Sequence, residues 1–173
     1  MTRIATLIGP ADQGRRMSLA EFDRAEGVPG FLYELSKGVI TVMDVPALPH
    51  AAQLEALRDQ FILYRAQNPG RIRHVFGGGE SKVLLEESES ERHPDLSIYF
   101  RASEEPGNWA VYIPEIVAEI ISPSSRHRDY EEKAPEYLQF GVREYWIVDR
   151  PRGEMIVHRR AGGRWHVAAV KPP

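Results

Sequence analysis

Apolar residues along this chain gather in short runs, and the run over residues 116–121 is the most informative. It is apolar except for Glu119, which is typical of a strand buried on both faces of a sheet. Residues 129–140 have a helical composition that ends at Gly141, a common C-terminal stop. Residues 144–148 form a second buried run. This order predicts a strand, a helix and a parallel strand joined by a right-handed crossover.

The remaining patterns predict a mixture of strands and helices. Ser18 and Glu21 fit a capping box that opens a short helix ending near residue 27. Apolar residues at helical spacing predict a long helix over residues 50–67. Pro135 predicts a kink or a restart in the helix over 129–140. Two hairpins are expected, one at 31–35 and 39–43 and a final one at 155–159 and 165–169. Further strands are expected at 71–76 and 95–100, and residues 82–85 either continue the strand at 71–76 or pair with it. Residues 86–92 and 102–108 are expected to be loops.

These elements predict the α/β or α+β class, with a central mixed β-sheet flanked by helices and an N-terminal β-hairpin extension. A length of 173 residues predicts one domain with a sizeable core. We assign residues 17–173 to this domain and residues 1–16 to an N-terminal tail, which we expect to be a loose tail or an arm.

Composition narrows the class of protein. Apolar residues make up 42% and charged residues 27% of the chain, as in ordinary globular proteins. No apolar run approaches the roughly 20 residues that a membrane helix needs. The N-terminal apolar stretch is too short for a secretory signal. We therefore expect a cytoplasmic protein that does not cross a membrane.

The chain has no cysteine and a net charge of −3. Disulfides and thiolate metal sites are thereby excluded. Oxygen and imidazole ligands remain, and they favour hard cations such as Mg²⁺ or Mn²⁺. The net charge argues against a strongly basic coat for nucleic acid, although local arginine clusters occur. For those clusters a solvated surface is the favoured interpretation.

Two acids and a lysine are the first candidates for chemistry. Glu119 lies inside a buried run, where a carboxylate costs several kcal/mol unless it is paired or binds a cation. The structural alternative is a buried salt bridge. Asp95 follows Pro94 at the start of a strand, where an ordinary turn explains it equally well. Lys133 follows Asp129 by four residues, so a helical ion pair is its simplest explanation.

Two further residues are weaker candidates. Alternation along the strand at 31–35 places Glu34 opposite the apolar face, so solvent exposure is modestly favoured for it. His50, just before the long helix, is a candidate metal ligand, base or cap, although a lone histidine is usually neither a ligand nor a base. The run Gly77–Gly79 lacks the spacing of a phosphate-binding loop and indicates a flexible turn.

Taken together, these segments resemble the Uma2 family of endonucleases, within the PD-(D/E)XK restriction-endonuclease-like superfamily. The resemblance runs from about residue 18 to 160, and it depends on the order and spacing of short pieces. The matching pieces are Tyr33-Glu34-Leu35, Gly38-Val39-Ile40, His50, Pro94-Asp95, Val117 to Ser125, Asp129, Lys133 to Tyr137, and Gly141 to Asp149.

The resemblance implies metal-dependent hydrolysis of phosphodiester bonds in DNA. By that resemblance, Asp95, Glu119 and the Ile120 carbonyl would bind Mg²⁺ or Mn²⁺, and Glu34 would be an additional acid. The superfamily places a lysine two residues after the second acid, where this chain has Ile121. Lys133 would then be the migrated lysine, and an electrostatic role is safer for it than a role as base.

Three functions stay open from the sequence. The first is a metal-dependent DNA endonuclease that pairs as a homodimer to cut two strands, as nucleases of this superfamily often do. The second is a catalytically weak or inactive nucleic-acid-binding or dimerisation module on the same fold. The third is a metal-dependent enzyme that acts on a small phosphate ester.

Overall fold

The computed structural model describes residues 6–122 and 124–171, and a six-stranded mixed sheet forms its centre. The strand order is β12-β11-β10-β9-β8-β5. Strands β9 and β10 run parallel, as predicted, and the other neighbours are antiparallel. The strands are β5 (His74–Gly77), β8 (Leu96–Tyr99), β9 (Ile116–Ile120), β10 (Glu144–Asp149), β11 (Glu154–Ala161) and β12 (Arg164–Val170).

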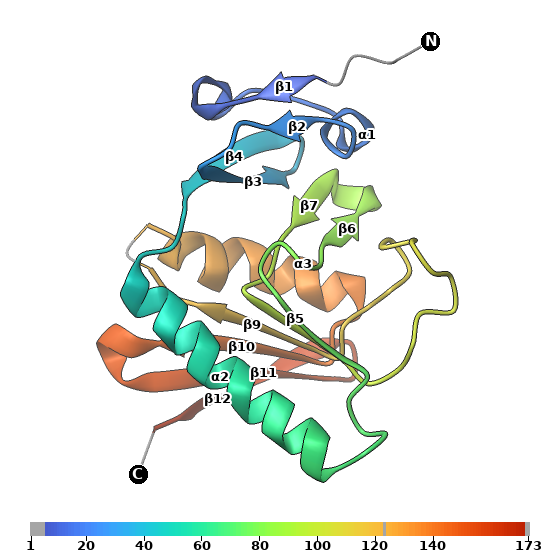
Figure 1. Cartoon of the computed structure of the whole chain (residues 1–173), viewed down its shortest axis with the longest axis vertical. Coiled ribbons are helices and arrows are strands. Elements are labelled where there is room, and N and C mark those ends of the chain that lie inside the picture. The colour runs from blue at the N-terminus through green and yellow to red at the C-terminus, as the bar shows by residue number, and fades with distance from the viewer. Residues whose placement is uncertain (1–5, 123, 172–173) are drawn as a thin grey trace.

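Helices lie on both faces of this sheet (Figure 1). Helix α2 (Leu48–Gln67) packs on one face through Leu54, Leu57 and Phe61. Helix α3 (Lys133–Phe140) packs on the other face through Ala134 and Tyr137. A strand directs alternate side chains to opposite faces. Along β9, Ile116 and Ala118 therefore join the core beneath α2, and Val117 joins the core beneath α3. This arrangement confirms the α+β fold with a flanked mixed sheet.

A smaller body sits beside the main sheet, at the top of Figure 1. It holds a four-stranded sheet in the order β4-β3-β7-β6 and a two-stranded parallel sheet of β1 and β2. The predicted hairpin extension is present as β3 and β4. The elements are β1 (Leu7–Ile8), η1 (Pro10–Asp12), α1 (Leu19–Phe22), β2 (Glu26–Gly27), β3 (Phe31–Ser36), β4 (Val39–Asp44), β6 (Val83–Leu85), η2 (Glu86–Ser88) and β7 (Ser90–Arg92).

The N-terminal segment differs from the loose tail predicted for residues 1–16. Over its described part, Ile8 is only 2% exposed and packs with Leu35 and Ile40. Backbone hydrogen bonds join residues 14 and 15 to Ile40 on β4. The expectation of a loose segment was wrong for residues 6–16, because their few apolar side chains complete the core of the smaller body. Residues 1–5 lie outside the described residues.

Two other expectations need correction. Residues 90–92, predicted as loop, form strand β7, which pairs with both β3 and β6. Residues 83–85 form β6 in this smaller sheet instead of extending the strand near 71–76. Polar sequence misled the prediction here, because Ser90, Glu91 and Arg92 are buried by polar partners and not by an apolar core.

The crossover helix contains an irregular turn just before Pro135. A π-helical turn, η3 (Arg128–Glu132), leads directly into α3. Proline cannot donate a backbone hydrogen bond, so a widened turn before it is physically reasonable. The predicted disturbance at Pro135 therefore takes the form of a π-helical turn. A short 3₁₀ turn, η4 (Arg150–Arg152), links β10 to β11. Within residues 6–122 and 124–171, no helix combines the length and apolar character that crossing a membrane requires.

Candidate active site

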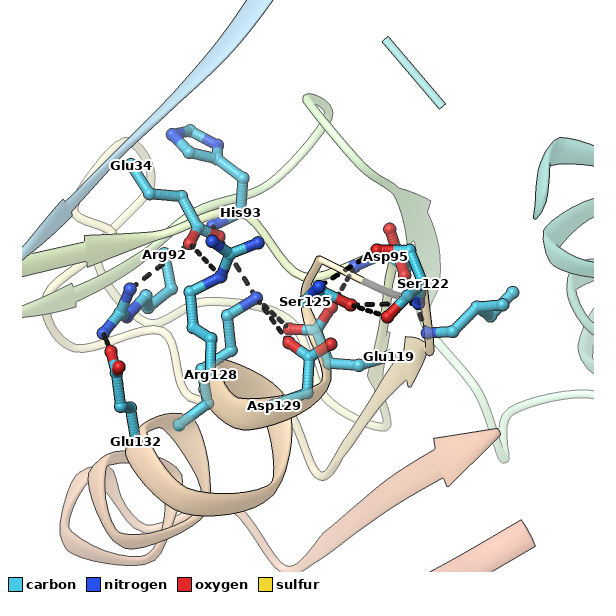
Figure 2. Close-up of polar contacts among 12 residues, drawn as sticks. Glu34, Arg92, His93, Asp95, Glu119, Ser122, Ser125, Arg128, Asp129 and Glu132 are labelled. Atoms are coloured by element: carbon cyan, nitrogen blue, oxygen red, sulfur yellow. Dashed lines mark hydrogen bonds and ion pairs between the residues drawn. The ribbon is translucent and has the colours of Figure 1, made fainter. Parts of the chain in front are cut away.

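Asp95 and Glu119 meet where β8 begins and β9 ends. The backbone N–H of Asp95 donates to Glu119 Oε2 at 3.3 Å, and the N–H of Ile120 donates to Asp95 Oδ2 at 2.7 Å. Adjacent antiparallel strands place both acids there, since Leu96 pairs with Ala118. Glu119 is 3% exposed, and it points to the α3 face because it alternates with Ala118. The two predicted acids therefore lie together (Figure 2).

Lys133 reaches the same place from the first residue of α3. Its Nζ lies 2.9 Å from Glu119 Oε1, 3.3 Å from Glu34 Oε1 and 3.3 Å from Asp129 Oδ1. The side chain is 4% exposed. Ile121, where the superfamily carries its lysine, is buried in the apolar core under α3. Position 121 lies on the same strand face as Glu119. Because this position holds isoleucine, the positive charge beside Glu119 comes from Lys133 on the helix.

Glu34 belongs to this cluster as well. It comes from β3 of the smaller body and is 1% exposed, so the favoured interpretation as a solvent-exposed acid was wrong. Its Oε1 accepts from the backbone N–H of His93 at 3.1 Å, and its Oε2 lies 3.3 Å from Arg92 Nη1. Both sheets therefore contribute acids to one site.

Arg92 links this cluster to α3. Its guanidinium, 0% exposed, donates to both carboxylate oxygens of Glu136 at 2.8 and 3.1 Å and to Ser36 Oγ at 2.8 Å. A paired arginine fork of this kind fixes orientation as well as charge. Arg92, on β7, thus contacts side chains of both β3 and α3 next to Glu34.

The π-helical turn brings Asp129 and Tyr130 to different places. Asp129 is 1% exposed and faces Lys133. Tyr130 instead donates to Asp149 Oδ2 at 2.8 Å, and Arg126 Nη2 donates to both oxygens of the same carboxylate at 2.7 and 2.9 Å. The buried Asp149, at the end of β10, therefore anchors the segment that carries Asp129 and Lys133.

His50, at the start of α2, lies on the other side of Asp95. Its Nε2 is 3.1 Å from Asp95 Oδ2. The hydrogen bond to Asp95 raises the pKa of His50 above its usual value, although burial opposes this. His50 is therefore a direct neighbour of the first acid, and it does not cap the helix, whose N-cap is Ala47.

The acids in the cluster favour a protonated Lys133, and burial together with those acids disfavours an ionised Glu119. Burial would lower the pKa of Lys133, but Glu119, Glu34 and Asp129 raise it above its usual value. Burial raises the pKa of Glu119 to about 8; Asp95, Asp129 and Glu34 add to this, and Lys133 offsets only part of it. Burial also opposes ionisation of Glu34, yet Lys133, Arg92 and Arg128 lower its pKa to about 2. Lys133 is thus suited to stabilise nearby negative charge as a cation, and it is not suited to act as a base.

Sequence reasoning underweighted some members of this site. Asp129 entered as the partner of a helical ion pair and as one position of the family resemblance, and Arg92 was not named as a candidate. Tyr137, which donates to Glu119 Oε1 at 2.8 Å, entered only as the last residue of one piece of the family resemblance. The available signal was polar spacing, since positions 129, 133, 136 and 137 fall on the buried side of one helix.

A hard divalent cation fits the residues that are present. In the described part of the chain, no three His, Asp or Glu residues form a ready-made metal cluster. Mg²⁺ commonly uses only one or two carboxylates and takes its other ligands from water and substrate phosphates. Asp95 and Glu119 supply that number. Burial and, after it, the neighbouring acids raise the pKa of Glu119, and a bound cation would oppose both effects.

Comparisons with known proteins concern the family and the fold of the chain. A crystal structure described as "a putative nuclease belonging to DUF820 from Anabaena variabilis" matches with a TM-score of 0.72 at 19% identity, over 91% of this chain and 86% of that chain. At this identity the likeness concerns the fold. None of the curated proteins searched matches the chain. The model of the Uma2 family, described as "Putative restriction endonuclease", matches residues 19–173. The chain therefore belongs to the Uma2 family.

Proposed function

We propose that the protein is a metal-dependent endonuclease that hydrolyses phosphodiester bonds in DNA. The supporting observation is the placement of Lys133 Nζ 2.9 Å from Glu119 Oε1, beside Asp95. Membership of a family described as "Putative restriction endonuclease" supports the same reaction class. DNA as the substrate, Mg²⁺ or Mn²⁺ as the metal, action as a homodimer and a cytoplasmic location are parts of this proposal.

Asp95, Glu119 and the Ile120 carbonyl would hold the metal. The Ile120 N–H already faces Asp95, and a residue in a strand directs its N–H and C=O to the same side. When bound, the metal would supply Lewis acidity toward a phosphate oxygen and lower the pKa of a water.

The chain's own groups would then orient the reaction. Lys133 stays charged among three carboxylates, so it is suited to stabilise the negative charge that develops on phosphorus-bound oxygens. Tyr137 donates to the same Glu119 oxygen and keeps that carboxylate in place. Glu34 and Asp129 hold the ammonium from its other sides.

Plasmid nicking tests the proposal. With Mg²⁺ or Mn²⁺, the wild-type chain should nick supercoiled plasmid, and a chelator should stop it. Asp95→Asn and Glu119→Gln should each lose at least about 100-fold in rate, the scale of losing one transition-state contact. Glu104→Gln, an exposed acid in a distant loop, is the matched control.

The outcome separates the alternatives. Equal nicking by wild type and both acid variants would mean a contaminating nuclease and would refute the proposal. Tight DNA binding without nicking, by a folded wild-type chain, would favour the inactive binding module. Cleavage of a small phosphodiester but not of plasmid would favour an enzyme for small phosphate esters.

A further inference from the structure

Arg128 has the weakest partners among the three cations that lie near Glu34. Arg92 donates to a carboxylate at 2.8 Å, and Lys133 Nζ lies 2.9 Å from another. Arg128 Nε lies 3.9 Å from Glu34 Oε2, which is beyond hydrogen-bond distance. The Arg128 side chain is 17% exposed, whereas the side chains of Lys133 and Arg92 are 4% and 0% exposed. Of the three, Arg128 is therefore the cation that a ligand from solvent can reach.

The hydrogen-bond donors of Arg128 are only partly used. Its Nη2 donates to Met43 Sδ at 3.1 Å, and a thioether sulfur is a weak acceptor. Its Nε is buried and has no hydrogen-bond partner among the residues that the structure describes. A charged group taken largely out of water is ordinarily stabilised by a close partner of opposite charge. Within residues 6–122 and 124–171, no carboxylate comes close enough to Arg128 to hydrogen-bond it.

The sequence offers Arg128 a local partner that the fold does not use. Glu132 follows it by four residues, the spacing at which opposite charges on a helix ordinarily pair. Glu132 instead lies 3.8 Å from His127 Nε2 and accepts from Ser36 Oγ at 3.4 Å. The helix is widened here, because the N–H of Lys133 donates to the Arg128 carbonyl five residues earlier, and such π-helical turns are frequent at functional sites. Figure 2 shows Arg128 extending from this turn toward Glu34 on β3.

We propose that Arg128 binds a phosphate of the substrate DNA strand, next to the phosphate that is cleaved, and thereby positions that strand over Asp95 and Glu119. The inference rests on the proposed function and names a residue that holds its substrate. A guanidinium is always charged, and its planar fork matches two phosphate oxygens. Lys133 contacts Oε1 of Glu34 beside Glu119, whereas Arg128 faces Oε2. This placement assigns the neighbouring phosphate to Arg128 and the cleaved phosphate to the groups around Glu119.

A purely structural role is the alternative for Arg128. In that role the side chain would only join the π-helical turn to the smaller body, through Met43 and Glu34. The two roles differ in their effect on DNA binding. A cation that neutralises a phosphate releases a counterion from DNA, so the affinity falls more steeply with salt, and a structural contact has no such effect. The salt dependence of binding therefore separates the two roles.

Fluorescence anisotropy of a short labelled DNA duplex, with the full chain in EDTA, measures binding apart from metal-dependent cleavage. Arg128→Met, which keeps much of the apolar stem, should weaken binding at least about tenfold, the effect of losing one charged hydrogen-bonded contact. Between about 50 and about 200 mM salt, the wild type should lose about threefold more affinity than Arg128→Met, because it makes one more phosphate contact. Arg128→Lys should weaken binding by a smaller factor and keep the wild-type salt dependence, because it retains the charge and loses only the fork.

Arg101→Met is the matched control. It removes the same charge from a side chain that is 85% exposed, beyond the end of β8 that lies away from Asp95. The affinity and its salt dependence should change much less than in Arg128→Met. Plasmid nicking with Mg²⁺ gives a second readout. Arg128→Met should raise KM and leave kcat nearly unchanged, because the neighbouring phosphate is held equally in the substrate and in the transition state.

Urea unfolding shows which of these variants are folded and can be compared. If Arg128→Met does not fold, Arg128→Lys decides, since it keeps a positive charge beside Glu34. Wild-type affinity in the folded Arg128 variants, or an equal loss in Arg101→Met, would overturn the phosphate contact. DNA binding that depends on Arg128, in a chain that does not nick plasmid, would support the contact and refute the proposed cleavage.

Discussion

The substitution Glu119→Gln should make the metal-free protein progressively more stable, relative to wild type, as the pH rises. The pKa of Glu119 is raised from 4.5 to about 8 by burial and by the acids around it. Between these two values the folded chain binds a proton that the unfolded chain has lost. Unfolding therefore releases a proton, and the free energy of unfolding of the wild type falls as pH rises. Glutamine carries no charge and removes this dependence.

The magnitude follows from the size of the shift. A shift from 4.5 to about 8, at about 1.4 kcal/mol per pH unit, gives an upper bound of about 5 kcal/mol between pH 4 and pH 9. The coupling of Glu119 to Lys133 and Asp95 reduces this, so we expect a change of at least about 2 kcal/mol. In a chain of this length, that corresponds to a shift of roughly 4–8 °C in the unfolding midpoint.

Urea unfolding of both proteins at pH 5, 7 and 9 in EDTA measures this effect. The quantity to follow is the difference between Glu119→Gln and wild type, because any packing cost of the amide is the same at each pH. Glu104→Gln gives the background for an exposed acid. Mg²⁺ should then stabilise the wild type and not Glu119→Gln, since a bound ligand stabilises the folded state. If the difference in free energy of unfolding between Glu119→Gln and wild type stays constant from pH 5 to 9, the pKa of Glu119 is not raised in the folded chain and the reasoning is refuted.

Three further substitutions probe the buried charges. Lys133→Met should lower the free energy of unfolding, measured with urea, by about 3–5 kcal/mol, because it leaves Glu34, Glu119 and Asp129 buried without their shared cation. A decrease of less than about 1 kcal/mol would contradict this. Arg92→Met should cost a similar amount, and adding Glu136→Gln should recover part of it in a double-mutant cycle, whereas simple additivity would argue against a direct pair. Asp149→Asn should lower the unfolding midpoint and reduce nicking by loosening Arg126 and Tyr130, and unchanged nicking would show that the π-helical turn needs no anchor there.

Much of the main sheet could be predicted from periodicity. The run at 116–121 is apolar apart from Glu119 because α2 and α3 cover the two faces of β9, and a buried strand leaves a strong sequence signal. The run at 144–148 was also predicted to be buried, but only alternate residues of β10 are fully buried. The crossover and the final hairpin follow from these runs and from turn residues. The smaller body was harder to predict, because Ser90 to Arg92 are buried through hydrogen bonds that a hydropathy pattern does not report.

The residues of the candidate site likewise fall into two groups, those that the sequence pattern indicated and those that it did not. The apolar flanks of Glu119 indicated a buried acid, and the structure places it 3% exposed against a lysine. Glu34 could not be distinguished from a surface acid by alternation on β3, because its burial depends on Arg92 and Lys133, which are distant in sequence. The family resemblance indicated Lys133 as one of these partners, and nothing in the sequence indicated Arg92.

The position of the lysine explains why this site needs so many buried charges. A lysine on the strand, at position 121, would extend from the same face as Glu119 without further support. Here the lysine comes from α3, and its Nζ must be held against the sheet by Asp129 and Glu34 as well as by Glu119. Burial raises the pKa of Glu119, and the extra acids add to this effect. Against the effect of burial, Lys133, Arg92 and Arg128 lower the pKa of Glu34. The Asp149 anchor holds the π-helical turn that carries Asp129, and β3 brings Glu34, so both contribute to holding the one positive charge that the helix supplies.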